Sequence, residues 1–318
     1  MKSLSFASLA YEQKKKKTRR EQFLEEMDKV IPWESMVKLI KPHYPKAGNG
    51  RKPMELEMML RIYFLQQWYG LSDPAMEDSL YDIESMRRFA GIDLQADDVP
   101  DETTILHFRH LLEKHKLTEK LFAQTRRYLI DKGLMLKEGT IVDATILTAP
   151  SSTKNSEQKR DPEMKSTMKG NQWYFGMKAH IGTDTGKGLV HSIVVTSAAV
   201  NDFKVMDDLL HGEEKAVYGD KAYDGKTRKE DYEANGIEWC VKRKASRHYA
   251  LTEEDKEFNR LHGKVRAKVE HVFGVVKNLW RYRKVRYKGL YKNAVQVYSL
   301  FTLANLYLVR KELLVGMG

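Results

Sequence analysis

The chain has 318 residues, 42% hydrophobic and 31% charged, so it can bury one large core or two smaller ones and is typical of a globular rather than a disordered or fibrous protein. Its formal net charge of +11 favours a polyanionic partner, although anionic lipid would be attracted as well. Its apolar stretches are shorter than the roughly 20 residues of a membrane span and its N-terminus lacks the apolar core of a secretory signal, so we expect no membrane partner and a reducing cytoplasm.

The N-terminal region begins with a basic arm and continues with sequence of helical periodicity. The arm comprises Lys14, Lys15, Lys16, Lys17, Arg19 and Arg20, which either contact phosphate or form a solvated segment. Apolar spacing then predicts helices over 53–70, after Asp73, over 103–114 and over 119–131, with Thr118 as N-cap and Gly133 as stop. We expect residues 1–135 to form an all-α domain for DNA binding and dimerisation. A helix-turn-helix within it is one reading, and ordinary helix pairs are the other.

After Gly139 the pattern becomes typical of strands. We predict strands at 140–147, 173–181, 189–196, 216–220 and 237–241, with helices at 202–210 and near 228–234. This is the element order of a ribonuclease-H-like α/β fold, a mixed five-stranded sheet with flanking helices, which we assign to residues 136–318. In the second strand Trp173 belongs to the apolar alternation, while Lys178 and His180 share a polar face that either approaches DNA or is ordinary surface.

Two further segments lie around these strands. Residues 150–172 are polar apart from Met164 and Met168, which predicts a long mobile loop whose lysines and Arg160 could touch DNA. Cys240 is the single cysteine and lies in an apolar run, so we expect a buried, inert thiol. Cysteine and histidine do not occur at the spacing of a zinc site.

Two aspartates stand out among the 44 carboxylates because of their position. Asp143 lies within the first predicted strand and Asp220 ends the fourth, where a carboxylate is costly to bury unless it is paired, hydrogen-bonded or bound to a cation. Either one alone is equally well explained by a salt bridge or a cap. The first and fourth strands are neighbours in a ribonuclease-H-like sheet, so we expect both carboxylates to face one cleft.

A third carboxylate is expected from a helix over 264–280. An apolar stripe predicts that this helix packs on the sheet, and it consists of Val265, Val269, Val272 and Val276. Arg266, Glu270 and Lys277 share the adjoining face, either as a solvent-facing salt-bridge ladder or as part of an active site. Together with the two aspartates, Glu270 predicts a catalytic trio that binds two Mg²⁺ or Mn²⁺ ions for in-line displacement at a phosphodiester. Arg266 and Lys277 would hold phosphate nearby.

A basic segment follows this helix. Its cations are Arg281, Arg283, Lys284, Arg286 and Lys288, and they alternate with Trp280, Tyr282 and Tyr287. The mixture suits phosphate contacts with base stacking, or else a basic edge packed by its own aromatic rings. The final helical stretch is strongly apolar, which favours core or a dimer surface.

Several strings together resemble bacterial transposases of the insertion-sequence-five group and their insertion-sequence-four neighbours. They are Val142-Asp143-Ala144-Thr145, Gly170-Asn171-Gln172-Trp173, Gly219-Asp220-Lys221-Ala222-Tyr223, Arg266-x-x-x-Glu270-x-x-x-x-x-x-Lys277, Pro45-Lys46-Ala47-Gly48-Asn49-Gly50-Arg51 and Tyr287-Lys288-Gly289-Leu290. The resemblance covers nearly the whole chain. It departs at Gly263, where many insertion-sequence-four relatives carry a tyrosine associated with hairpin-forming excision.

This resemblance implies an Asp-Asp-Glu transposase with Asp143, Asp220 and Glu270 as its catalytic metal ligands. Such an enzyme would act as a homodimer or higher oligomer on DNA, at the nucleoid of the bacterial cytoplasm. It would bind terminal inverted repeats, nick the element ends and transfer the 3′ ends to target DNA. A nuclease of the same fold and an inactive, domesticated DNA-binding protein remain the alternatives.

Overall fold

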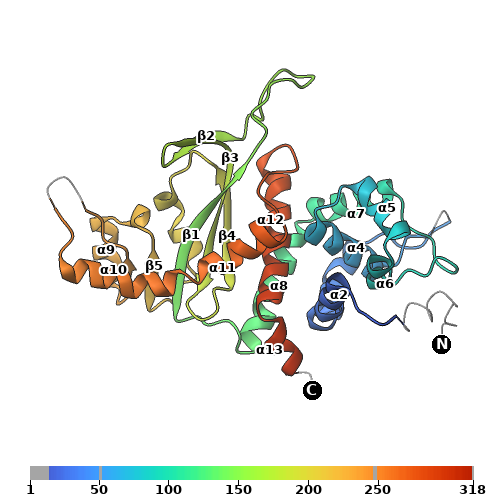
Figure 1. Cartoon of the computed structure of the whole chain (residues 1–318), viewed down its shortest axis with the longest axis horizontal. Coiled ribbons are helices and arrows are strands. Elements are labelled where there is room, and N and C mark those ends of the chain that lie inside the picture. The colour runs from blue at the N-terminus through green and yellow to red at the C-terminus, as the bar shows by residue number, and fades with distance from the viewer. Residues whose placement is uncertain (1–13, 50–51, 246–248, 317–318) are drawn as a thin grey trace.

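The computed structural model describes residues 14–49, 52–245 and 249–316 (Figure 1). A helical N-terminal part lies at one end of the molecule, and a mixed sheet with its covering helices lies at the other. Residues 1–13 of the predicted N-terminal domain, and Gly50 and Arg51 of the resembling string, lie outside the described residues. Within the described residues no helix combines the length and the apolarity needed to cross a membrane.

The N-terminal part is helical, as predicted. Its α-helices are α2 (Arg19–Val30), α3 (Trp33–Ile40), α4 (Leu56–Tyr69), α5 (Asp73–Asp82), α6 (Glu84–Ala90), α7 (Glu102–Lys114) and α8 (Leu117–Asp131). Gly70 adopts a left-handed conformation (φ 67°) that ends α4, which a residue without a side chain does at little cost. The predicted cap of α8 is wrong: Lys116 precedes the helix, and Thr118 is buried within its first turn.

The sheet has the predicted mixed topology. Its strands are β1 (Gly139–Thr148), β2 (Lys165–Lys169), β3 (Gln172–Asp184), β4 (Val190–Ser197), β5 (Ala216–Gly219) and β6 (Glu238–Val241). β1 runs antiparallel to β3 and parallel to β5, and β5 runs parallel to β6. β2 and β4 pair with consecutive parts of β3. The five predicted strands therefore form a ribonuclease-H-like mixed sheet. β2 is a sixth strand that the sequence did not predict.

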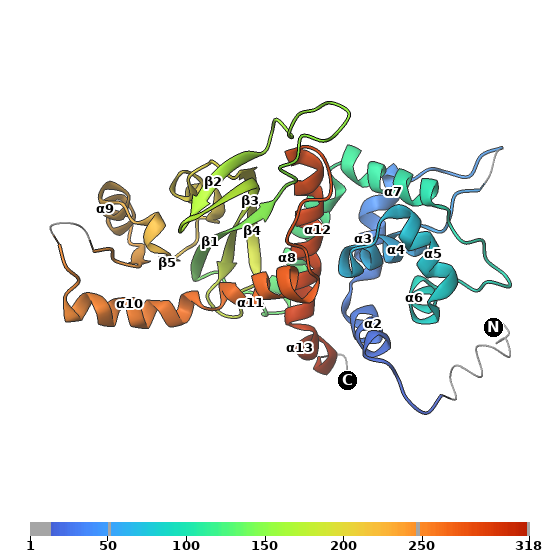
Figure 2. The ribbon, with the colours of Figure 1, turned by 45° about the horizontal axis from the view of Figure 1, so that its top comes forward.

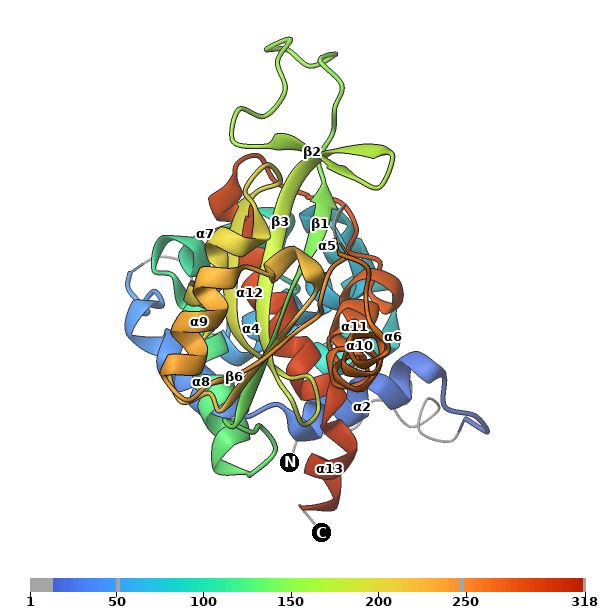
Figure 3. The same cartoon turned by 90° about the vertical axis from the view of Figure 1, so that its left-hand side faces the viewer.

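Two local predictions in this part are wrong. The segment 150–172 is not a loop throughout, because β2 lies within it and Met164 is buried in the core. Pairing with β3 satisfies one edge of β2, and its other edge and its polar side chains face solvent as those of an edge strand. The remainder of the segment projects beyond the sheet (Figure 3). The predicted helix over 202–210 is two short 3₁₀ turns, Asp202–Val205 and Asp207–Leu209.

The C-terminal helices cover the sheet and connect it to the N-terminal part. They are α9 (Lys226–Ala234), α10 (Glu253–Arg266), α11 (Val269–Gly274), a π-helical turn (Val275–Leu279), α12 (Leu290–Leu308) and α13 (Arg310–Val315). The predicted helix over 264–280 is thus wrong at its start and in its continuity. The observed helix α10 begins after Thr252, whose hydroxyl caps it in a capping box with Asp255. In Figure 2, α10 and α11 run one after the other along the sheet toward α12.

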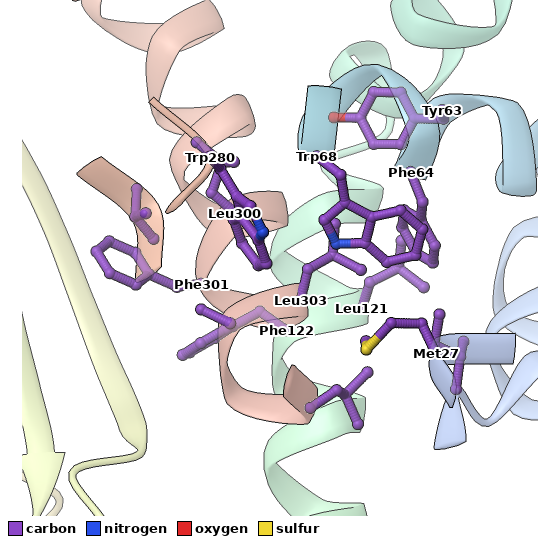
Figure 4. Close-up of a cluster of buried hydrophobic side chains, with 14 of the residues drawn as sticks. Met27, Tyr63, Phe64, Trp68, Leu121, Phe122, Trp280, Leu300, Phe301 and Leu303 are labelled. Carbon is purple, nitrogen blue, oxygen red and sulfur yellow. The ribbon is translucent and has the colours of Figure 1, made fainter. Parts of the chain in front are cut away.

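One apolar core crosses the predicted domain boundary at residue 135. It includes Met27 and Phe64 from the N-terminal helices, Leu121 from α8, and Leu300 and Leu303 from α12 (Figure 4). The Tyr63 hydroxyl also lies 2.8 Å from Ser299 Oγ in this interior. α12, predicted to be core or dimer surface, is therefore core that joins the helical part to the sheet. The division into domains 1–135 and 136–318 stays a prediction.

Candidate active site

A cleft of about 870 Å³ opens beside β1, between the β2–β3 hairpin and the α11 helix. Its charged lining residues are Asp143, Asp202, Asp220, Glu270, Lys169, Lys178, Arg266, Lys277, Arg283 and Lys284. Acidic side chains from β1, from the end of β5 and from α11 thus share one cavity with several cations. This mixture can bind both a cation and a phosphate.

Asp143 lies in the middle of β1 and is mostly buried. Its Oδ1 accepts a hydrogen bond from the Ala144 amide at 2.8 Å, and its Oδ2 accepts one from Arg266 Nη2 at 2.8 Å. Burial raises the pKa of Asp143, the Arg266 charge lowers it, and the charges of Glu270 and Asp220 raise it further. The net rise means that the ionised carboxylate lacks sufficient positive charge around it.

Asp220 follows directly after β5 and caps the 3₁₀ turn Lys221–Tyr223. Its Oδ1 accepts a hydrogen bond from the Lys221 amide at 2.7 Å. The register of the parallel pair places Ile141 of β1 beside Tyr218 of β5. Asp143 and Asp220 each come two residues later, so both lie at the same level of adjacent strands and on the same face.

Glu270 extends into the cleft from the first turn of α11, and its side chain is 61% exposed. Glu270 Oε1 lies 3.9 Å from Arg266 Nη2, so this guanidinium stands between Glu270 and Asp143. The three carboxylates predicted from the sequence therefore line one cleft. Carboxylate oxygens are hard ligands that fit Mg²⁺ or Mn²⁺, and the unbalanced charge at Asp143 suits a cation. Their role as metal ligands stays a prediction.

The two cations predicted to accompany the trio make contacts within the protein. Arg266 binds Asp143, while its Nε is buried with no partner in the described part of the chain. Lys277 Nζ donates to Thr145 Oγ1 at 3.0 Å and to the Ile146 carbonyl at 3.1 Å. Burial lowers the pKa of Lys277, and the nearby charges of Lys169 and Arg283 lower it further. Both cations line the cleft, where a phosphate group could meet them.

Lys178 and His180 do not form the exposed polar face expected of β3. Lys178 Nζ donates to the Val200 carbonyl at 2.8 Å and to Asp202 Oδ1 at 2.9 Å, at the border of the cleft. His180 is 0% exposed, its Nε2 lies 2.8 Å from Thr196 Oγ1, and burial lowers its pKa to about 4. β3 is covered on both faces from Gly176 onward, so alternation does not bring either face to solvent there. His180 is therefore not a surface contact for DNA in this structure.

The basic arm is partly engaged with the first helix. Lys14 forms an ion pair with Glu21, and Lys17 Nζ lies 2.8 Å from Glu25 Oε1. Arg19 and Arg20 belong to the first turn of α2, and the Arg20 guanidinium lies 5.3 Å from the centre of the Tyr69 ring. Lys15 and Lys16 are exposed. Arg19 and Arg20 are exposed as well, so the described arm keeps accessible charge besides the two paired lysines.

The aromatic rings of the basic segment 280–288 pack against the protein itself, which is the alternative to base stacking that the sequence analysis gave. Trp280 and Tyr282 are buried in the core, and Tyr287 lies under Arg109 at 4.6 Å from the ring centre. These rings are thus unavailable for base stacking. Arg283 and Lys284 line the cleft, and Arg281 and Arg286 are exposed. Lys288 forms a 2.7 Å ion pair with Glu157 of the projecting segment.

Sequence analysis missed an exposed apolar pair on the β2–β3 hairpin, of which only Met168 lines the cleft. Trp173 is 68% exposed and Met168 59% exposed, and they face each other across β2 and β3. Met168, Lys169 and Tyr174 of the same hairpin line the cleft. The alternation that placed Trp173 in the core fails because β3 extends past the covering elements at this end. The Gly170-Asn171 turn, with Gly170 at φ 61°, is the signal that could have revealed the hairpin.

Comparison with known proteins adds a family assignment to this geometry. Residues 134–306 match the family described as "Transposase DDE domain", and residues 11–111 match "Transposase domain (DUF772)". A cryo-EM structure of a piggyBac transposase synaptic complex with hairpin DNA aligns at 10% identity over 92% of this chain and 74% of that chain, with a TM-score of 0.47. A crystal structure of the Mos1 strand transfer complex aligns at 12% identity over 77% of this chain and 82% of that chain, with a TM-score of 0.20.

Proposed function

This chain belongs to the Transposase DDE domain family of metal-dependent DNA-cleaving and strand-transfer enzymes, and from this premise we propose that it mobilises an insertion sequence. It binds the terminal inverted repeats of the element, nicks the ends and transfers the 3′ ends to target DNA, as a homodimer or higher oligomer on DNA. The observation that carries this proposal is the convergence of Asp143, Asp220 and Glu270 on one cleft that also contains Arg266 and Lys277.

In this proposal the three carboxylates hold two Mg²⁺ or Mn²⁺ ions. When bound, such a pair activates the attacking oxygen and stabilises the leaving oxygen of a phosphodiester. The position of Asp143 and Asp220 at one level of two neighbouring strands keeps these two ligands fixed, while the exposed Glu270 can adjust to the substrate. Arg266 offsets part of the charge of Asp143, and its guanidinium, with Lys277, orients a phosphate in the cleft.

The proposed activity is tested by incubating the purified chain with Mg²⁺ and labelled DNA that carries candidate element ends taken from the flanking sequence. Nicked ends followed by joined products support transposition. Cleavage without joining favours a nuclease of the same fold. Binding without cleavage favours a domesticated DNA-binding protein, and it would contradict the proposed catalytic role of the trio.

Trp173 is expected to stack on a base of the DNA strand that passes the cleft. Replacing it with alanine should weaken binding of a labelled element end by roughly 5- to 150-fold, since stacking on an aromatic ring contributes about 1–3 kcal/mol per base. The other four tryptophans are buried or half-buried, so the accessible part of the indole fluorescence belongs mainly to Trp173. Acrylamide quenching of this fluorescence should fall when DNA is added.

The matched control for this prediction is Leu261→Ala, which removes an exposed apolar side chain on α10 outside the cleft lining. This variant should bind the element end as the parent protein does. Equal affinity of Trp173→Ala and the parent protein, with unchanged quenching on adding DNA, would show that the hairpin does not touch the substrate.

The basic arm is expected to contribute to the salt dependence of DNA binding through Lys15 and Lys16. Each phosphate that a cation neutralises adds about 0.9 to the negative slope of log affinity against log salt concentration. Lys15→Ala/Lys16→Ala should therefore flatten this slope by up to about 2, and replacing Lys14 to Lys17 together should flatten it at least as much. Lys226→Ala on α9, which removes a cation that is 90% exposed, serves as control. An unchanged slope in the arm variants would identify a solvated arm without a role in binding.

A further inference from the structure

A cluster of three potential metal ligands lies outside the carboxylate cleft, where the edge strand β6 meets α10. It consists of Glu238 and Cys240 of β6 and His262 of α10, and one ligand atom from each lies within 4.8 Å of those of the other two. Glu238 and Cys240 are two residues apart on a strand, so they point to the same face. The sequence spacing of these residues is not that of a zinc site, and only the tertiary fold brings His262 to the strand.

The surroundings of the cluster fit a ligand site better than simple side-chain packing. Cys240 is buried, His262 is half-buried and Glu238 is exposed, so the cluster has a closed inner end and an open outer end. Aromatic rings flank the imidazole, with the centre of Phe258 at 4.1 Å and that of Tyr218 at 5.6 Å. Among the described residues no hydrogen bond to a ring nitrogen of His262 is found.

We propose that Glu238, Cys240 and His262 bind one zinc ion that anchors α10 to the edge of the sheet. A thiolate and an imidazole favour a borderline-soft metal, whereas the all-oxygen cleft favours Mg²⁺ or Mn²⁺. Bonds of about 2.0–2.3 Å to a tetrahedral ion bring ligand atoms to roughly 3.3–3.8 Å from one another. The exposed Glu238 side chain can supply the small movement required. On binding, the thiol proton is released to solvent and a sulfur–zinc bond forms, and a water molecule completes the fourth position.

This anchor would act where apolar packing is sparse. Asp255 is the buried residue of α10, and Leu261 of the same helix is half exposed. The helix is otherwise held by polar contacts such as Arg243 Nη1 to Asp255 Oδ1 at 2.6 Å. Its last turn carries Arg266, which binds Asp143. A zinc ion at β6 would therefore stabilise the helix that holds a cation of the cleft in place.

The experiment is a titration of the reduced, full-length protein with Co²⁺ in the absence of DNA. Because Cys240 is the only cysteine, any near-ultraviolet thiolate-to-cobalt absorption must come from this residue. We expect saturation at one equivalent, reversal by Zn²⁺, and loss of the band in Cys240→Ser and in His262→Ala. Glu270→Gln and His110→Ala, which change the cleft and an exposed histidine elsewhere, should retain it.

Two measurements on the parent protein keep the proposal testable even if a variant fails to fold. The absence of a thiolate band on adding Co²⁺ would overturn it. So would unchanged hydrogen exchange of the α10 amides on adding one equivalent of Zn²⁺, because an anchored helix must open less often. Since neither measurement uses DNA or catalysis, failure of the zinc site and failure of the proposed transposition are distinguishable.

Discussion

Asp143→Asn, Asp220→Asn and Glu270→Gln should each reduce both nicking and strand transfer by more than about 1,000-fold, which corresponds to a loss of roughly 4 kcal/mol of transition-state stabilisation. The three carboxylates line one cleft from three different elements, and both steps are displacements at a phosphodiester that would use the same metal pair. The amide variants keep the shape of each side chain while removing its charge. Rates are measured on the labelled element end with Mg²⁺, and binding of the same DNA should persist.

The same substitutions distinguish metal ligands from charges that stabilise the fold. The pKa of Asp143 is raised above its usual value, so without metal its ionised form destabilises the folded state, increasingly as pH rises above the ordinary aspartate range. Asp143→Asn should therefore be at least as stable as the parent at pH 7. Regaining about 1 kcal/mol would raise the unfolding midpoint by roughly 2 °C in a chain of this size. The gain should disappear near pH 3, where the parent carboxylate is protonated as well.

Asp131→Asn, which neutralises an exposed carboxylate at the end of α8, should leave both rates and the unfolding midpoint unchanged. Cleavage by Glu270→Gln at the parental rate would remove Glu270 from the trio. Another acidic residue lining the cleft, of which Asp202 is the candidate that the structure offers, would then have to replace it.

Leu303→Ala should destabilise the whole chain by about 2–5 kcal/mol, the usual cost of a cavity at a fully buried leucine. Leu303 is 0% exposed and belongs to the core that joins the N-terminal helices to α12 (Figure 4). Because this core is continuous, we expect the variant to unfold in one transition at a lower denaturant concentration. Circular dichroism for the helices and tryptophan fluorescence for tertiary packing should report the same midpoint.

Leu94→Ala provides the matched control, since this leucine is about half exposed and its truncation should cost less than about 0.5 kcal/mol. Two separated transitions in Leu303→Ala, with the N-terminal helices melting alone, would favour the predicted division at residue 135 over a single cooperative core.

The local sequence pattern was sufficient to predict most of the fold. Alternation and β-branched residues located the five strands of the ribonuclease-H-like sheet, because each strand is specified by its own residues. Periodicity and stop signals such as Gly70 and Gly133 located α4, α5, α7 and α8 to within a few residues, whereas α2, α3 and α6 were not predicted. The continuity of the helices could not be predicted in this way. The helix breaks between Arg266 and Val269 and continues into a π-helical turn, so that the segment packs against both the sheet and α12.

The candidate site was likewise predicted in part from the sequence and in part only from the tertiary structure. By itself the sequence determined which carboxylates to consider, since Asp143 and Asp220 lie in apolar strands and Glu270 lies beside an apolar stripe. Only the tertiary structure decided which cations are free to meet a phosphate and which side chains reach solvent. His180 is buried because β3 is covered on both faces at this residue, and Trp173 is exposed because β3 extends past the elements that cover it. Lys14 and Lys17 form ion pairs with Glu21 and Glu25. Burial and pairing depend on what other segments place against a residue, and no local pattern contains that information.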